Sequence, residues 1–206
     1  ITADATLRKK FVNNLMDLVE TYNLDGLDLD WEAISSSLKP IASQYNLLCE
    51  ELRAEMTRRQ DEGGSPYLLT MAVPASSYGT ATDRFDFPTL NKYLDYINIM
   101  SYDLNNGEKT THLSPLYTST KDNGYGFGAV YGVNRISSLG FDKNKLIIGC
   151  AGYGKAYTVS GGSGTYPALG ISGKLTKISG YDGSYASGTV YGSVINQLIN
   201  TGKYTQ

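Results

Sequence analysis

The chain has 206 residues, a formal net charge of −2 and a hydrophobic fraction of 41%. This length allows one substantial domain with a buried core, and the small negative charge without a basic run excludes nucleic acid as an expected partner. No apolar run approaches the roughly 20 residues that a membrane-spanning helix needs, so no membrane association is expected. The first residues, Ile1 to Asp4, lack the pattern of a secretory signal, which indicates that a signal was removed or never existed.

Cysteine and tyrosine usage gives two further expectations. Cys49 and Cys150 lie far apart, and a chain of this size is no small disulfide-stapled scaffold, so two buried thiols are expected rather than a disulfide. Tyrosine is common, with 17 residues against 5 phenylalanines. Tyrosine rings stack on sugars while their hydroxyls form hydrogen bonds, which suits carbohydrate contact. Partly exposed tyrosines at the edge of a core are the alternative interpretation.

The first part of the chain predicts two helices and two strands. The apolar stripe of the first helix comprises Leu7, Phe11, Leu15, Leu18 and Tyr22, widened by Val12 and Val19. A strand over residues 25–32 follows directly. A second helix is expected from Pro40 to about Gln60, closed by Gly63 and Gly64. The near-continuous apolar run at residues 67–73 predicts a strand covered on both faces.

Strands and helices keep alternating in the second part. A helical stretch at residues 88–94 precedes a strand at 96–103. After a loop that contains His112, a helix is expected around residues 130–139 and a strand at 145–150. This alternation predicts a parallel sheet. The single histidine, His112, is interpreted as loop scaffolding rather than a proton-transfer group.

From residue 156 the composition changes to Gly, Ser, Thr and Tyr, with short strand-like pieces. The region ends in a helical pattern formed by Val190, Val194, Leu198 and Ile199. We therefore expect residues 156–206 to form an insertion or a small appended layer, separate from the alternating part at residues 1–155.

Acidic residues occupy every second position of the predicted strand at 25–32. Asp28, Asp30 and Glu32 alternate with Leu27, Leu29 and Trp31. Because strand side chains alternate between faces, the carboxylates share one face at intervals of ~7 Å. Like charges this close repel, so the row is expected to retain a proton at neutral pH, which predicts acid catalysis.

The acidic row has two alternative interpretations. One is a solvated strand face without chemistry, although three acids in line are an unusual choice for such a face. The other is a calcium site, because aligned carboxylates bind hard cations. The EF-hand pattern fails since no glycine occupies the required turn position after the third acid, so no metal site is predicted.

Reactive residue types also follow two later strands, and in parallel α/β folds active groups gather at the carboxyl ends of strands. Met100, Tyr102 and Asp103 end one strand, and Tyr153 and Lys155 end another. Met100 and Tyr102 share strand parity, so both are expected on one face. A single site that receives Glu32 and Tyr102 from different strands is predicted.

The segment Gly149 to Lys155 has the glycine and lysine spacing of a phosphate-binding loop. Ala156 stands where a serine or threonine must hold magnesium, and no helix is expected to follow. The sequence therefore predicts no nucleotide site here.

Several motifs together resemble glycoside hydrolase family 18, the chitinases and their relatives. The row Asp25-Gly26-Leu27-Asp28-Leu29-Asp30-Trp31-Glu32 matches the signature D-G-x-D-x-D-W-E of that family, and Met100-Ser101-Tyr102-Asp103 matches its M-x-Y-D strand end. His112 to Leu116 resembles the loop that follows, and Gly149 to Lys155 resembles the strand G-x-P-x-Y-G-R. Departures occur at Ala33-Ile34, where many members have Y-P, at Ala151 in place of proline and at Lys155 in place of arginine, and they leave the substrate preference open.

The resemblance implies an α/β fold, a partial TIM (β/α)8 barrel with a small α+β insertion after the seventh strand. Residues 1–155 would supply strands four to seven with their catalytic ends, and residues 156–206 part of the insertion subdomain. A complete barrel usually needs ~250 residues, so the chain is interpreted as a fragment of a larger enzyme.

The resemblance also implies a substrate-assisted, retaining mechanism without cofactor. Glu32 would protonate the glycosidic oxygen, Asp30 would hold the acetamido N–H of the substrate, and Asp28 would share a proton with Asp30. Tyr102 would donate to the acetamido carbonyl. The remaining sugar contacts would come from Met100, Asp103 and Tyr153, and Asp25 and Gly26 would have a structural role.

Two functions stay open at this point. One is a secreted chitinase-type glycosidase that acts on β-1,4-linked N-acetylglucosamine in chitin or a glycan core. The other is a lectin-like protein that binds chitooligosaccharide on the same scaffold without catalysis. Lectin-like relatives usually lose the acid at the position of Glu32, so its presence favours the enzyme. Self-association through exposed sheet edges is a further expectation, since unpaired edges invite pairing.

Overall fold

The computed structural model describes residues 2–32, 42–75, 85–104, 107–119, 128–161 and 169–201. The chain forms two compact units. The first comprises Ile1–Met100 with Gly132–Ile148, and the second comprises Ser101–Tyr131 with Gly149–Gln206. Each unit thus consists of two separate segments of the chain. The domain boundary at residue 155 stays a prediction.

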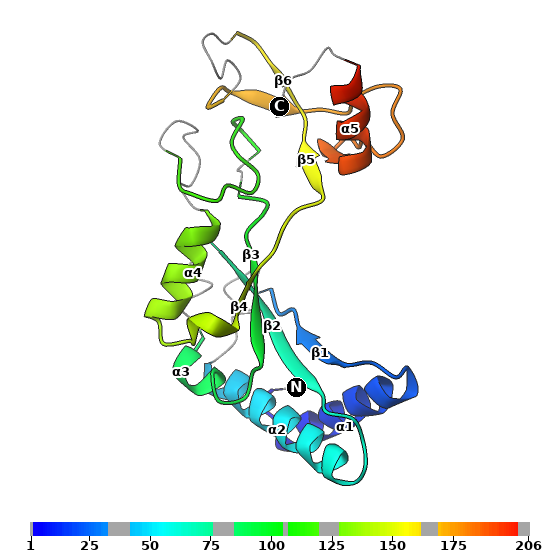
Figure 1. The fold of residues 1–206 in the computed structure, drawn as a ribbon, viewed down its shortest axis with the longest axis vertical. Helices are drawn as coiled ribbons and strands as arrows, with labels where there is room; N and C mark the ends of the chain where they lie inside the picture. Colours follow the sequence, from blue (N-terminus) through cyan, green and yellow to red (C-terminus); the bar gives the residue numbers. More distant parts are fainter. Residues whose placement is uncertain are drawn as a thin grey trace. The chain divides into compact units, whose positions relative to one another are not determined.

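The first unit contains a four-stranded parallel sheet, as the alternating pattern predicts (Figure 1). The strands are β1 (Gly26–Leu29), β2 (Leu68–Pro74), β3 (Tyr96–Met100) and β4 (Leu146–Ile148). Their order in the sheet is β1-β2-β3-β4, so each strand pairs with the strand before it in the chain. β3 ends at Met100, three residues before the predicted end.

Helices precede and connect these strands near the predicted places, but the helix expected at residues 88–94 is shorter and spans Phe87–Leu90. They are α1 (Ala5–Thr21), α2 (Ala42–Asp61), α3 (Phe87–Leu90) and α4 (Ala129–Ser138), and a 3₁₀ turn (Lys143–Lys145) leads into β4. Asp4 caps α1, because its carboxylate accepts the N–H of Leu7 at 2.9 Å. Figure 1 shows α1 and α2 side by side. The predicted start of the second helix at Pro40 lies outside the described residues, as do Ala33 and Ile34.

The predicted apolar stripe of α1 is wrong in part. The buried apolar side chains are Val12, Met16 and Val19, whereas Leu7 and Leu18 are about half exposed. Tyr22 lies just beyond the helix and is 69% exposed. The helix carries two apolar stripes, and only the one centred on Met16 faces the core of the first unit.

Alternation along β2 and β3 builds this core. Leu69, Met71, Val73, Ile97 and Ile99 are fully buried. The opposite face carries Thr70 and Asn98, which are only half-buried, and Leu68 is exposed, so the expectation that β2 is covered on both faces holds for part of the strand only. The buried face therefore fixes which side chains β1 to β3 present on the other side.

Ion pairs join α1 to α2. Arg59 on α2 contacts Glu55 on the same helix and reaches Asp17 and Glu20 of α1 at 2.8 and 2.7 Å. Arg8 of α1, which is buried, contacts Glu51 of α2 at 2.6 Å. An arginine shared by several carboxylates restricts both helices, because its planar donors fix the geometry of each contact.

The second unit holds short antiparallel pairs and one helix. β5 (Tyr153–Lys155) pairs with β8 (Thr189–Tyr191), and β6 (Tyr157–Val159) pairs with β7 (Gly173–Leu175). The helix is α5 (Gly192–Asn200). Val190, Val194 and Leu198 form a small core.

Three sequence expectations are corrected in this part of the chain. Val190 belongs to β8 and not to the final helix, because the chain stays extended as far as Tyr191, the residue that precedes α5. β4 ends at Ile148, so Tyr153 and Lys155 lie on the separate strand β5 and not at the end of β4. Cys150 is exposed, whereas Cys49 is buried, and both are free thiols. Over the described residues, no helix has the length and apolar character to cross a bilayer.

Candidate active site

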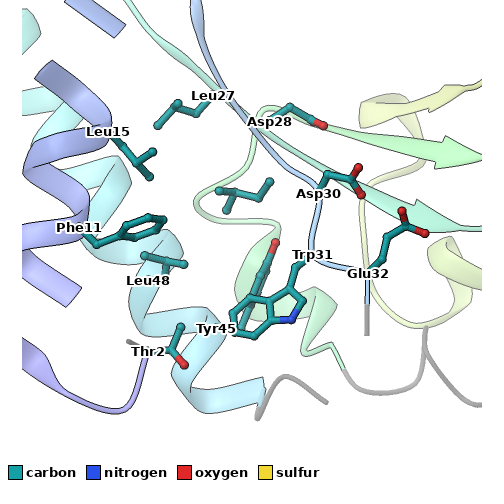
Figure 2. Close-up of a pocket in the computed structure, with 11 residues that line it drawn as sticks. Thr2, Phe11, Leu15, Leu27, Asp28, Asp30, Trp31, Glu32, Tyr45 and Leu48 are labelled. Atoms are coloured by element: carbon teal, nitrogen blue, oxygen red, sulfur yellow. The ribbon is translucent and has the colours of Figure 1, made fainter. Parts of the chain in front are cut away.

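The acidic row lies at the end of β1. Asp28 is within the strand, and Asp30 and Glu32 follow it. All three are exposed. Figure 2 shows their carboxylates on one side of the chain, while Leu27 and Trp31 point to the other side, toward α1 and α2. The alternation that the sequence predicts is therefore present in the structure.

Gly26 determines how β1 meets β2. A Cβ added to this residue would lie 1.9 Å from the carbonyl oxygen of Leu68, so any side chain would collide with the backbone of β2. The N–H of Leu68 donates to the carbonyl of Asp25 at 2.9 Å, which starts the parallel ladder. The glycine of the motif thus has a structural role, and it sets the register that carries the acids.

A cavity of about 760 Å³ lies beside β1 and reaches both sides of the strand. Its walls come from α1, α2 and the acidic row (Figure 2): Thr2, Phe11, Leu15, Leu27, Asp28, Leu29, Asp30, Trp31, Glu32, Tyr45 and Leu48. The apolar part of the wall consists of the side chains that β1 turns away from the carboxylates.

Tyr45 of α2 supports the strand from this apolar side. Its ring lies edge-on to Trp31, with centroids 5.8 Å apart, and 5.1 Å from the ring of Phe85. The side chain is 1% exposed, and its hydroxyl has no hydrogen-bond partner within the described part of the chain. Burial raises the pKa of Tyr45, and the nearby carboxylates of Asp28 and Asp30 raise it further. The phenol therefore stays protonated and cannot act as a base.

Two neighbouring strands hold Asp28. Its Oδ1 accepts a hydrogen bond from the hydroxyl of Thr70 on β2 and another, at 2.8 Å, from Nδ2 of Asn98 on β3. Sequence analysis did not single out these two residues. The signal that could have found them is a polar side chain inside each of two otherwise apolar strands.

The predicted sugar contacts lie in both units. Met100 is the last residue of β3 and is half-buried. Tyr102 and Asp103 come after the strand and belong to the second unit. β3 ends at Met100, so the alternation of side chains along a strand does not apply to Tyr102. The prediction that Tyr102 and Met100 share one face is therefore not supported by strand geometry. The joint site of Glu32 and Tyr102 stays a prediction.

Asp103 and Tyr153 form a pair within the second unit. The hydroxyl of Tyr153 donates to Oδ2 of Asp103 at 2.5 Å. Burial and this hydrogen bond raise the pKa of Tyr153. Asp103 has φ at +55°, a conformation that short polar side chains tolerate better than others. The two residues that the family resemblance assigns to sugar contact are thus brought together.

Lys155, which stands where the family motif has arginine, is engaged within the second unit. Its Nζ donates to the hydroxyl of Thr189 at 2.8 Å and lies 5.8 Å from the ring centre of Tyr153. Both contacts use the ammonium as a single point charge, a geometry that does not need the fork of an arginine.

The described residues give little support for a metal site or for a reactive thiol at Cys49. Among the described residues, no group of three His, Cys, Asp or Glu side chains is arranged to hold a metal ion. Burial raises the pKa of Cys49 to about 12, so this thiol is protonated at neutral pH.

Comparison with known proteins identifies the family. The model of the glycosyl hydrolases family 18 matches residues 1–204. The chain belongs to glycosyl hydrolase family 18. The resemblance carried by the acidic row and by Met100 to Asp103 is thereby confirmed.

Similar curated proteins are chitinases by name. The chain is 33% identical over 172 residues to chitotriosidase-1 of Mus musculus, covering 79% of this chain and 36% of that protein. It is 30% identical over 185 residues to a probable endochitinase of Caenorhabditis elegans, covering 88% of this chain and 29% of that protein. A probable chitinase of Drosophila melanogaster is 29% identical, and the match covers only 8% of it.

Solved structures of glycosyl hydrolase family 18 relatives share the fold. An immunomodulatory active chitinase from Trichuris suis matches with a TM-score of 0.81 and 28% identity, over 98% of this chain and 54% of that one. Catalytic domain 2 of the Ostrinia furnacalis Group II chitinase matches with a TM-score of 0.79 and 28% identity, over 99% and 53%. With its parallel sheet and helices, the chain has the predicted α/β fold of TIM-barrel type, and it spans about half the length of these structures.

Proposed function

We propose that this chain supplies the proton-donating part of a chitinase-type glycosidase that hydrolyses β-1,4-linked N-acetylglucosamine polymers. The observation that carries the proposal is the row Asp28, Asp30 and Glu32, whose carboxylates are exposed on one side of β1 (Figure 2). Chitinase relatives support the substrate class. A mutant of catalytic domain 2 of the Ostrinia furnacalis Group II chitinase has been crystallised with penta-N-acetylchitooctaose, and the Group IV chitinase with allosamidin.

The proposed reaction uses the acetamido group of the substrate as nucleophile. Glu32 gives its proton to the glycosidic oxygen while the acetamido oxygen bonds to the anomeric carbon, and the bond to the leaving sugar breaks. Water then attacks the same carbon, Glu32 takes the proton of that water, and the oxazolinium ring opens. Two inversions at one carbon give net retention. Asp30 holds the acetamido N–H, and Asp28 supports Asp30.

The remaining predicted site residues bind the sugar in this proposal. Tyr102 donates to the acetamido carbonyl, and Met100 contacts the ring. Asp103 and Tyr153 act as a pair, since the hydroxyl of Tyr153 already donates to Asp103. An acceptor and a hydroxyl that are held together present both hydrogen-bonding polarities to sugar hydroxyls.

A binding protein without catalysis is the second candidate. A chitinase-like agglutinin from Robinia pseudoacacia shares the fold, with a TM-score of 0.76 and 26% identity. In this chain Glu32 is present and its carboxylate is exposed beside Asp30, which favours the enzyme. We also propose secretion, because chitin is an extracellular polymer.

Turnover of a fluorogenic chitobioside by the protein that carries this chain tests the proposal. Glu32→Gln removes the proton donor and is expected to lower kcat by about 10²- to 10⁴-fold, the usual contribution of a general acid. Glu62→Gln, the same change at an exposed position just after α2, is the control and should leave kcat unaltered. Equal rates for wild type and Glu32→Gln would refute the acid role. Binding of chitooligosaccharide without turnover by the wild type would favour the lectin-like function.

A further inference from the structure

We propose that Thr70 and Asn98 are positioning residues of the acidic row. They hold the carboxylate of Asp28 in the orientation in which it serves Asp30. The inference rests on the proposed function in one respect: the row is taken to be the catalytic centre. The contacts themselves lie within the first unit and belong to three adjacent strands.

Sheet geometry brings the three side chains together. Asp28 and Thr70 are register partners on β1 and β2, so their side chains stand next to each other on one face. Asn98 lies on β3, about 10 Å from β1 at the usual strand spacing of 4.7–4.9 Å. Its register partner on β2 is Ala72, which carries only a methyl group. The side chains of Asp28 and Asn98 can therefore meet above β2.

Both donors reach the same oxygen of Asp28. The hydroxyl of Thr70 and Nδ2 of Asn98 donate to Oδ1, so neither of them engages Oδ2. Rotation of the carboxylate away from this orientation would break two hydrogen bonds to a charged acceptor, which are stronger than bonds between neutral groups. Asp28 and Asp30 project to the same side of β1 (Figure 2). Fixing Oδ1 therefore leaves Oδ2 as the oxygen for the neighbouring carboxylate.

Neither residue needs to touch the substrate to affect the reaction. Asp28 acts on Asp30, and Asp30 acts on the acetamido group that becomes the nucleophile. A misoriented Asp28 is expected to weaken the step in which charge develops, while sugar binding depends on other contacts. The loss should therefore appear in kcat and not in KM.

Isosteric substitutions test this assignment. Thr70→Val removes the hydroxyl at constant shape, and Asn98→Leu removes the amide donor. We expect each variant to lower kcat on the chitobioside about tenfold with a change in KM below about twofold, the size expected for one lost charged hydrogen bond. Thr70→Ser keeps the hydroxyl and should retain most of kcat. Thr57→Val removes a hydroxyl on α2, where it donates to the carbonyl of Arg53, and should behave as wild type.

A second measurement does not depend on activity. The side-chain amide protons of Asn98 are followed by NMR in the same protein, and Asp28→Ala should move the donated proton upfield. Where Asn98→Leu fails to fold, Asn98→Ala replaces it, since it removes the donor without adding a charge beside Asp28. Unchanged kcat in both donor variants of an active wild type would overturn the assignment. So would an Asn98 amide proton whose chemical shift is the same in Asp28→Ala as in the wild type. An inactive wild type refutes the proposed function. In that case the NMR result alone tests whether Asn98 donates to Asp28.

Discussion

The position of the acidic row depends on single residues. Gly26 has the least space for a side chain among them. Its backbone approaches β2 so closely that a Cβ would lie 1.9 Å from the carbonyl oxygen of Leu68. The oxygen belongs to the backbone of a paired strand, so it cannot move aside as the end of a flexible side chain could. The position therefore tolerates no side chain without a shift of the ladder.

Gly26→Ala is expected to destabilise the fold by roughly 3 kcal/mol, the upper end of the usual cost of overpacking. The comparison is Gly152→Ala, because a Cβ at Gly152 meets nothing within 4 Å, and this change should be nearly neutral. Urea unfolding of both variants measures the difference. Equal midpoints for the two variants would show that β1 can withdraw from β2 at little cost.

The two thiols are expected to react very differently. Cys150 is exposed, whereas Cys49 is fully buried and its pKa is raised to about 12 by burial. Iodoacetamide at pH 8 should therefore modify one cysteine per folded chain, which intact mass spectrometry can count. Cys150→Ser should abolish the fast modification. Rapid labelling of both cysteines in the native protein would contradict the burial of Cys49.

At the scale of elements, the charged face of α2 links that helix to α1. Glu55 accepts hydrogen bonds from Arg58 at 2.6 Å and from Arg59 at 2.8 Å. The hydrogen bond from Arg58 is the main cause that lowers the pKa of Glu55 to about 2, with Arg59 adding to it. Arg59 in turn reaches α1, so protonation of Glu55 affects the contact between the two helices.

This lowered pKa predicts a loss of stability in acid. The folded value lies below the ordinary value of 4.5, so the contribution of Glu55 is fully present above pH 4.5 and is lost as the pH falls toward about 2. Urea unfolding between pH 6 and pH 2.5 should show this decline, and Glu55→Gln should reduce its slope in that window. Asp61→Asn, on the same helix, serves as the comparison. Identical slopes for wild type and Glu55→Gln would exclude the assignment.

The elements that could be predicted from the sequence are those in which apolar or acidic residues recur at regular spacing. The apolar spacing predicted α1, α2 and α4 close to their observed bounds, and the acidic alternation predicted which side chains of β1 share a face. The buried stripe of α1 was predicted only in part: Val12 and Val19 were expected and Met16 was not, because a helix with two apolar stripes does not reveal which one meets its neighbours. The contacts of Thr70 and Asn98 with Asp28 were also missed, since they depend on strand register, which local patterns do not contain.

At the scale of the whole molecule, the sheet of the first unit has two outer edges. Among the described strands, β1 and β4 each pair on one side only. The unpaired backbone groups of such strands can pair with another chain. Ile147 on β4 is also 46% exposed, which adds an apolar side chain to that edge.

The 206-residue chain expressed alone is therefore expected to associate. Light scattering after gel filtration should give a mass above 22.4 kDa that rises with concentration. Ile147→Lys places a charge on the edge strand β4 and should lower the apparent mass, because edge charges oppose strand pairing. A constant mass of 22.4 kDa over the whole concentration range would contradict association through these edges.

The order of the strands has a consequence for how the protein is made. Since β1, β2, β3 and β4 lie in the sheet in the order in which they occur in the chain, β2, β3 and β4 each find the preceding strand already synthesised when they leave the ribosome. Pairing with the preceding strand keeps the sequence separation of each contact small, which favours fast folding. We expect β1, which carries Asp28, to lack its pairing with β2 until β2 has been synthesised. This interval is when a chaperone that recognises extended apolar segments would have most to protect.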